Sequence, residues 1–195
     1  LSSCTNKDSK SRESEVFRYN EHYNVATLDP AFARNPPIIW PTNQLFNGLV
    51  QQDEALNIVP DLAKSWTVDS ASTRYTFILR DDVYFHKHPR FNTPDSTRRL
   101  VASDFVYSFD RLKDPAVASP GSWVLSNVES YEATNDSTFT IELKKQFPAF
   151  LGLLTMRYCS AVPREIVEYY GNEFRSHPVG TGPFKFKRWE EGVKL

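Results

Sequence analysis

The strand pattern of residues 75–79 constrains this fold more than any other feature of the sequence. In "YTFIL" the two aromatic residues and Leu79 fall on one face, as in a strand that is buried on one side. Asp81 and Asp82 then supply turn chemistry, and large apolar residues return within 83–85. The pattern therefore predicts an antiparallel hairpin over residues 75–85.

A second unit of this kind lies in "ESYEATNDSTFTIEL", residues 129–143. Residues 135–137, Asn-Asp-Ser, favour a turn, and alternating apolar residues follow over 139–143. A short strand is also expected at "SEVFRYN", residues 14–20, where apolar and polar side chains alternate. Antiparallel strands are thus expected in several parts of the chain.

Helical spacing of apolar residues separates these strand patterns. Residues 105–112 form one apolar stripe, with Ser103 as the expected cap. Shorter helices are expected after Pro148 and Pro163, and another is expected to begin near Pro41 and to carry apolar residues up to Leu49. The sequence therefore predicts a mixed α+β fold.

Charge excludes some classes of partner. The chain has 23 lysine and arginine residues against 24 aspartate and glutamate residues, a formal net charge of −1. No positive excess is available to hold nucleic acid or an anionic membrane by charge. Nowhere do about eighteen apolar residues run together, so no membrane-spanning helix is expected in this sequence.

The first four residues, "LSSC", have the form of a bacterial lipoprotein cleavage box, which makes Cys4 a candidate for lipid attachment. Residues 5–14 are polar and are expected to form a flexible tether. The alternative is an arbitrary start with a chance cysteine. Cys159 is flanked by apolar residues and is expected to be a buried core residue.

Four motifs, taken together, resemble one family. They are "PDLAKSW" at 60–66, "YTFILRDDVYFH" at 75–86, "SDFVYSFDRL" at 103–112 and "PVGTGPFKFKRW" at 178–189. In this order and spacing they resemble the family 5 extracytoplasmic solute-binding proteins, which include the oligopeptide and dipeptide receptors of ABC importers. The segment "FHKHPRF" departs from the family pattern, because no Asp-Gly or Asn-Gly turn follows the histidine.

The resemblance implies part of the first lobe of a type II periplasmic binding protein fold, an α/β-like core sheet with an inserted α+β subdomain. It implies that residues 15–45 and 176–195 are core-sheet segments of lobe I, that 46–175 form the subdomain, and that 1–14 are the tether. Family members are more than twice as long, so the second lobe is expected to be absent from this chain.

Gly180, Gly182 and Pro183 are expected to form a structural hinge where the chain returns to the core sheet. Glycine reaches positive φ at no steric cost, and proline fixes the next φ near a value that a strand accepts. A phosphate-binding loop is the alternative, but it requires a helix after the glycines, whereas residues 184–189 alternate like a strand.

The loop "FARNPPIIW", residues 32–40, is the best candidate to line a ligand cleft, because prolines stiffen it and Arg34 suits a carboxylate. Trp123, on a second loop, could add an aromatic wall. The candidate ligand-binding residues are Arg34, Asn35, Pro36, Ile38, Trp40 and Trp123. In the alternative, residues 38–40 only pack the start of the helix and Arg34 points to water.

Other motifs carry less chemistry. His86 and His88 would share one face of a strand, where they could bind a metal or form a structural turn. Asp81 and Asp82 are expected in a solvated turn and not as an acid–base pair. No G-x-S-x-G motif occurs and the four histidines form no recognisable triad, so the sequence predicts no enzyme, no cofactor and no metal site.

The sequence therefore predicts a solute-binding lipoprotein of an ABC importer, which captures a peptide by closure of two lobes. The implied partners are the solute and the permease subunits, and the only membrane contact is a lipid anchor outside the cytoplasm. The alternatives are a related receptor for a nickel chelate, haem or another small solute, or an interaction or signalling module. An uncovered apolar face would favour dimerisation of such a fragment.

Overall fold

The computed structural model describes residues 23–190 of the chain. The predicted strand at 14–20, the tether and Cys4 lie outside the described residues. Among the helices within 23–190, none combines the length and the apolar character that crossing a bilayer requires. The predicted mixture of helices and antiparallel strands is confirmed.

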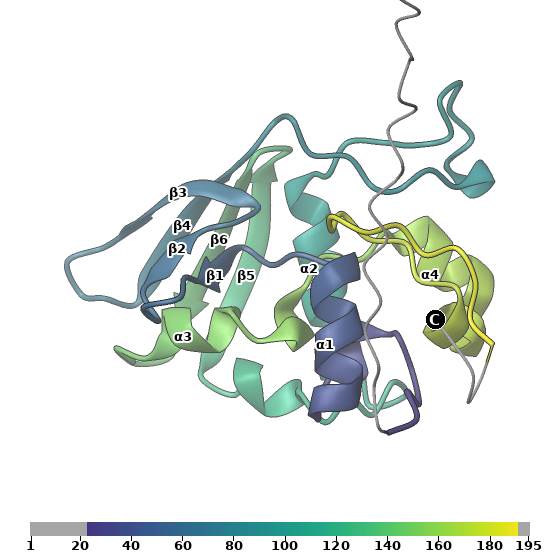
Figure 1. Ribbon diagram of the computed structural model, residues 1–195. Helices are drawn as coiled ribbons and strands as arrows, with labels where there is room; N and C mark the ends of the chain where they lie inside the picture. Colours follow the sequence, from purple (N-terminus) through teal and green to yellow (C-terminus); the bar gives the residue numbers. More distant parts are fainter. Residues whose placement is uncertain (1–22, 191–195) are drawn as a thin grey trace, which may run out of the picture.

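A four-stranded antiparallel sheet forms one side of the molecule, at the left in Figure 1. Its strands, in spatial order, are β3 (Ala63–Val68), β4 (Arg74–Leu79), β6 (Thr138–Leu143) and β5 (Val128–Asn135). Phe77 pairs with Trp66 on β3 and with Phe139 on β6, so one row of aromatic side chains crosses three strands. A second, two-stranded sheet consists of β1 (Val50–Gln52) and β2 (Ile58–Pro60).

The hairpin predicted over 129–143 is confirmed, because β5 and β6 pair across the predicted turn. The hairpin predicted over 75–85 is wrong. β4 pairs with β3 and β6 instead, and residues 83–85 contribute only an isolated bridge between Tyr84 and Arg99. The turn chemistry of "DD" is satisfied locally, since Arg80 donates two hydrogen bonds of 2.9 Å to the Asp82 carboxylate.

Helix α2 (Ala102–Lys113) packs on one face of the sheet, as its apolar stripe predicts. The Phe105 and Phe109 rings lie 5.6 and 5.5 Å from the ring of Phe139. Ser103 does not cap this helix, because it lies inside the first turn. The Asp104 carboxylate, three residues beyond Val101, accepts the Val101 N–H at 2.9 Å and stabilises the helix start instead.

The short helices α3 (Phe150–Leu154) and α4 (Arg164–Tyr170) are confirmed, and α4 stops at Gly171, which has a φ of 53°. Helix α1 (Pro36–Leu45) begins five residues before the predicted start and ends before Leu49. Asn35 is extended, and prolines 36 and 37 need no hydrogen-bond acceptor in a first turn, which explains the earlier start.

Within residues 23–190, five 3-10 helices connect these elements. They are η1 (Pro30–Phe32), η2 (Pro89–Phe91), η3 (Ser122–Leu125), η4 (Arg157–Cys159) and η5 (Gly171–Ser176). One continuous apolar core lies between the sheet, α2 and the segments that follow β6. Cys159 belongs to this core, being 1% exposed, and burial raises the pKa of its thiol to about 12, so the predicted core cysteine is confirmed.

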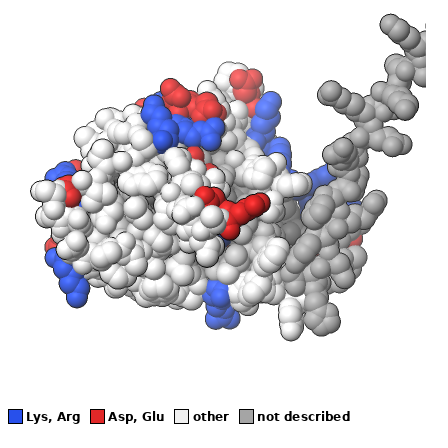
Figure 2. Space-filling model, turned by 60° about the vertical axis from the view of Figure 1, so that its left-hand side comes forward, with Lys and Arg blue, Asp and Glu red and all other residues white. Residues whose placement is uncertain are grey.

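The surface is mixed in charge. Figure 2 shows one side of the molecule on which charged side chains are few and acidic and basic ones stand next to each other along the top. Arg74, for example, lies 3.9 Å from Glu132 and 3.7 Å from Glu142 on the outer face of the sheet. The described residues on this side thus form no extended patch of one sign.

Candidate functional site

The loop that leads into α1 is fixed by a buried ion pair. The Asp29 carboxylate accepts the Ala31 N–H at 3.0 Å and two hydrogen bonds from the Arg111 guanidinium, at 3.2 and 2.7 Å. Their side chains are only 5% and 13% exposed. Burial by itself lowers the pKa of Arg111, but the hydrogen bonds to Asp29 outweigh it and raise the pKa. The pair therefore joins η1 firmly to α2.

A second loop, residues 119–123, is attached to η1 from the other side. The Ser119 hydroxyl donates to the Ala31 carbonyl at 2.6 Å and accepts the Gly121 N–H at 3.0 Å. A Cβ on Gly121 would lie 2.3 Å from the Tyr158 ring, so only glycine allows the loop to pass this close. The loop that carries Trp123 is thus held next to η1 and η4.

Exposed side chains gather around these anchors. Arg34, Asn35 and Pro36 are exposed at the amino-terminal end of α1, while Trp40, further along the helix, and Trp123 are 55% and 50% exposed. Figure 1 shows η1, η3 and the start of α1 along the lower side of the molecule. Five of the six candidate residues are therefore exposed.

The remaining candidate, Ile38, is 5% exposed and points into the core of the described structure. Two residues that the sequence did not single out lie on the segment that packs against the 119–123 loop at Gly121. Met156 is 38% exposed, and Arg34 lies near enough to Tyr158 to lower the pKa of its hydroxyl, although burial has the larger effect and raises it. Their segment, "TMRYCSAV", was notable in sequence only for its cysteine.

We call this set the cleft surface, after the role predicted for the loop 32–40: residues 34–36, Trp40, Trp123, Met156 and Tyr158. It combines two exposed tryptophans, one exposed thioether and one arginine with the buried Tyr158. Buried polar contacts join η1 to α2 and to the loop 119–123. Aromatic and methionine side chains contact apolar groups of many shapes, and arginine pairs with a carboxylate in two hydrogen bonds. Such a surface suits a small solute that has apolar side chains and a carboxylate.

The carboxyl-terminal end of α1 contacts residues 178–186, which we call the return segment. The Gly182 N–H donates to the Leu45 carbonyl at 2.9 Å, and the Phe184 N–H donates to the Gln44 carbonyl at 3.0 Å. Carbonyls at the end of a helix have no intrahelical partner, so these bonds satisfy groups that would otherwise be unpaired. The return segment therefore also serves to complete α1.

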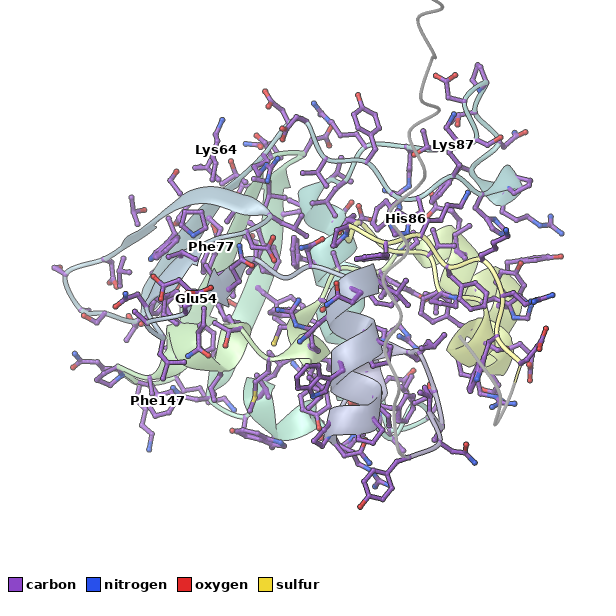
Figure 3. All side chains as sticks on the ribbon, in the orientation of Figure 1. Glu54, Lys64, Phe77, His86, Lys87 and Phe147 are labelled. Atoms are coloured by element: carbon purple, nitrogen blue, oxygen red, sulfur yellow. The ribbon has the colours of Figure 1, made fainter. Side chains whose placement is uncertain are left out.

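The segment 86–88 holds the return segment from the opposite side. The His86 N–H donates to the Gly180 carbonyl at 2.8 Å. The His86 Nε2 lies 2.7 Å from the Gly182 carbonyl oxygen, and because a carbonyl only accepts, Nε2 carries the hydrogen. Figure 3 labels His86 beside the yellow return segment.

The expected reason for the two glycines is wrong. Neither Gly180 nor Gly182 has a positive φ. A Cβ on Gly180 would instead lie 2.0 Å from the Leu45 carbonyl oxygen, and one on Gly182 would lie 2.4 Å from that of Gln44. Glycine is required here because two backbones approach each other closely.

The strand expected after Pro183 is also absent over residues 184–189. Alternation of side chains shows which face a strand would bury, but a strand also needs a hydrogen-bonded neighbour. Among the described residues, the backbone of the return segment bonds to the end of α1 and to His86 instead. The hinge role of Gly180, Gly182 and Pro183 stays a prediction, as does the division of the chain into core-sheet segments and subdomain.

The two histidines of "FHKHPRF" do lie together, and both line a small cavity. Within residues 23–190 no three histidine, cysteine or acidic side chains are grouped so that they could bind a metal ion. The Asp82 carboxylate is exposed and paired with Arg80.

Comparison with known proteins gives a consistent result. Residues 57–195 match the family model described as bacterial extracellular solute-binding proteins, family 5 middle. The glutathione-binding protein GsiB of Shigella flexneri is 30% identical over 168 residues, which are 86% of this chain and 31% of the relative. This chain thus spans about a third of the length of the curated relatives it matches.

Solved structures show the same relationship. DppA from Helicobacter pylori, in complex with the peptide STSA, is 31% identical with a TM-score of 0.75, over 85% of this chain and 35% of that one. Haemophilus influenzae OppA, in complex with RPPGFSPFR, is 27% identical with a TM-score of 0.74, over 85% and 34%. NikZ from Campylobacter jejuni, in complex with Ni(L-His), is 31% identical with a TM-score of 0.70, over 88% and 32%.

Proposed function

This chain belongs to the bacterial extracellular solute-binding proteins of family 5, and from that premise we propose that it forms one wall of a solute receptor for an ABC importer. The expected fold, a partial lobe of the type II periplasmic binding protein class, is confirmed by neighbours of which the chain covers about a third. The cleft surface is the part of this wall that contacts solute.

One observation supports the cleft surface most directly. The buried Asp29–Arg111 pair and the Ser119 bridge fix three separate segments against each other, while the side chains next to them remain exposed. Rigid support for exposed aromatic groups lowers the ordering cost of binding, as a receptor requires.

We propose that the solute is a peptide. Two of the similar structures contain peptides, and the exposed Arg34 suits a carboxylate. The function consists of capture and release when two lobes close and open, with no bond made or broken. The proposed partners are the solute and the permease subunits of an importer.

A second candidate is a receptor for another small solute. NikZ, which was solved with Ni(L-His), is as similar in sequence as DppA. In such a receptor the second wall would supply most of the specificity, because the described residues of this wall offer no group of metal ligands. Adding nickel with histidine in place of peptide separates the two candidates.

We further propose a location outside the cytoplasmic membrane, with lipid attached to Cys4. The form of "LSSC" followed by ten polar residues supports this. Mass spectrometry of the chain expressed with a complete lipoprotein signal tests it. A diacylglycerol adduct on Cys4 that disappears in Cys4→Ala is expected, whereas an unmodified Cys4 at the membrane would contradict it.

Backbone NMR of the purified chain tests the peptide proposal. One wall binds weakly, so a defined pool of tripeptides is expected to shift amide signals of residues 33–36, 119–123 and 156–158 at millimolar concentration. Arg34→Ala should reduce these shifts, whereas Arg188→Ala, in an exposed residue outside the cleft surface, should not. Shifts confined to other residues, or none, would remove the peptide assignment, and shifts with nickel–histidine alone would favour the second candidate.

A further inference from the structure

A small cavity separates the return segment from segment 86–88 and the end of α4. Its volume is about 90 Å³. Its polar lining consists of His86, Lys87, His88, Tyr170, His177 and Lys185. Among the described residues no aspartate or glutamate lines it, so the polar groups at its wall are cations, imidazoles and one phenol.

The hydrogen bonds of His88 determine what Tyr170 can do. The His88 Nδ1 accepts the Arg90 N–H at 3.2 Å, so in neutral His88 the hydrogen is on Nε2. Nε2 lies 3.0 Å from the Tyr170 hydroxyl and therefore donates to it. The hydroxyl keeps its own hydrogen for another acceptor, and no acceptor for it is found within residues 23–190. Tyr170 thus offers an unused donor at the cavity.

The Tyr170 ring is held in place by its neighbours. It stacks on the His177 ring with centroids 4.4 Å apart and planes 13° apart, and it meets the His88 ring at 70°. The His177 Nδ1 lies 3.0 Å from the Glu173 carbonyl oxygen and donates to it, which fixes the stack to η5. The donor is therefore positioned before any ligand arrives.

Positively charged side chains line the cavity. Lys87 and Lys185 form no ion pair with a carboxylate of the described residues. Burial lowers the pKa of His88, and Arg90, Lys185 and His177 each lower it further. Burial also lowers the pKa of His86, and Lys185 acts in the same direction. The charged groups of residues 23–190 that shift the pKa of these two histidines are thus basic residues.

We propose that this cavity binds a small oxyanion, a carboxylate or a tetrahedral group such as phosphate or sulfate, held by the Tyr170 hydroxyl and the Lys185 ammonium. Hydrogen bonds from a hydroxyl and an ammonium to an ionised acceptor are the strong kind. The volume admits one such group, whereas pockets for drug-sized ligands are several times larger. The return segment that forms one wall packs at the carboxyl-terminal end of α1, so this site is separate from the cleft surface and does not depend on the proposed transport function.

An NMR titration of the purified chain tests the proposal. Sodium phosphate, sodium sulfate and sodium acetate are added in separate experiments at constant ionic strength, and the ring signals of His88 and His177 are followed. At least one of the three anions should give saturable shifts that sodium chloride does not give. Saturable shifts with phosphate and sulfate but not with acetate identify a tetrahedral ligand. Saturable shifts with acetate alone identify a carboxylate ligand. No saturable shift with any of them overturns the proposal.

Two variants and a matched control locate the binding groups. Tyr170→Phe keeps the stacked ring and removes the donor, and Lys185→Met removes the charge, so each should weaken binding by about tenfold. Lys187→Met removes an exposed charge two residues further on and should change affinity less than about twofold. An equal loss in Lys187→Met would indicate general attraction by charge and overturn the site. If Tyr170→Phe does not fold, the comparison between Lys185→Met and Lys187→Met tests the site, because both side chains are exposed.

Discussion

The two ends of helix α1 are built in different ways. At the amino-terminal end, Arg34, Asn35 and Pro36 are exposed, and the structure beneath them is fixed by the side chains of Asp29 and Arg111. At the carboxyl-terminal end, backbone meets backbone, because the return segment bonds to helix carbonyls. Ten residues, about 15 Å of helix, separate the two arrangements.

The difference indicates that the two ends of α1 serve different purposes: the proposed binding of solute at one end and the packing of the chain at the other. Contacts made by side chains can change with sequence, so the amino-terminal end, where we propose that solute binds, can present different groups on one support. Contacts made by backbone need only that no side chain intervenes, which explains why the carboxyl-terminal end depends on Gly180 and Gly182. The first end suits recognition, and the second suits holding the chain together.

Removing the buried ion pair that supports the amino-terminal end of α1 should have the largest effect on the free energy of unfolding. Asp29→Ala leaves the buried Arg111 without its partner, and removal of one member of a buried pair costs about 3–5 kcal/mol. Urea unfolding measures the loss. Asp82→Ala is the matched control, since its pair with Arg80 is exposed and should be worth less than about 1 kcal/mol. Equal losses in the two variants would show that Asp29 does not support the loop.

Gly180→Ala tests the carboxyl-terminal end and should have the next largest effect. The added Cβ would lie 2.0 Å from the Leu45 carbonyl oxygen, which is backbone and cannot move aside cheaply. A loss of about 2–3 kcal/mol is expected, again by urea unfolding. Gly152→Ala is the control, because nothing lies within 4 Å of that site in α3 and alanine favours helix there. An unchanged Gly180→Ala protein would contradict the close-approach explanation.

Parts of the fold could be predicted because local periodicity determines them. The helix over 102–113 and the hairpin over 128–143 each carry a complete pattern within one short segment. Strand β3 was missed, since most of its side chains are exposed and its register shifts between Ala63 and Ser65. Alternation of side chains in β4 correctly predicts a strand, but it does not show which strands pair with it.

The candidate site divides in the same way. The sequence predicts the exposed amino-terminal end of α1 as a candidate site from its prolines and Arg34, because the stiffness of proline and the charge of arginine do not depend on tertiary structure. Tyr158 meets Gly121 only through tertiary packing, which no spacing in the sequence indicates. The contact between His88 and Tyr170 spans 82 residues, and no spacing in the sequence indicates it. The glycines were recognised as structural, but their reason needed the position of α1.

Lowering the pH should have the smallest effect on stability. It should act at the carboxyl-terminal end of α1, where His86 holds the return segment. Burial lowers the pKa of His86, and only the hydrogen bond to Gly182 opposes this. A histidine whose folded pKa lies below its unfolded value of about 6.5 stabilises the fold fully above that pH and loses this contribution as the pH falls. His86 Nδ1 is buried without a partner among the described residues, so a proton there finds no acceptor. Unfolding free energy, measured from pH 7.5 down to 5, should therefore decline less steeply in His86→Gln, which keeps a donor for Gly182. The same slope in both proteins would show that the return segment is not the acid-sensitive end.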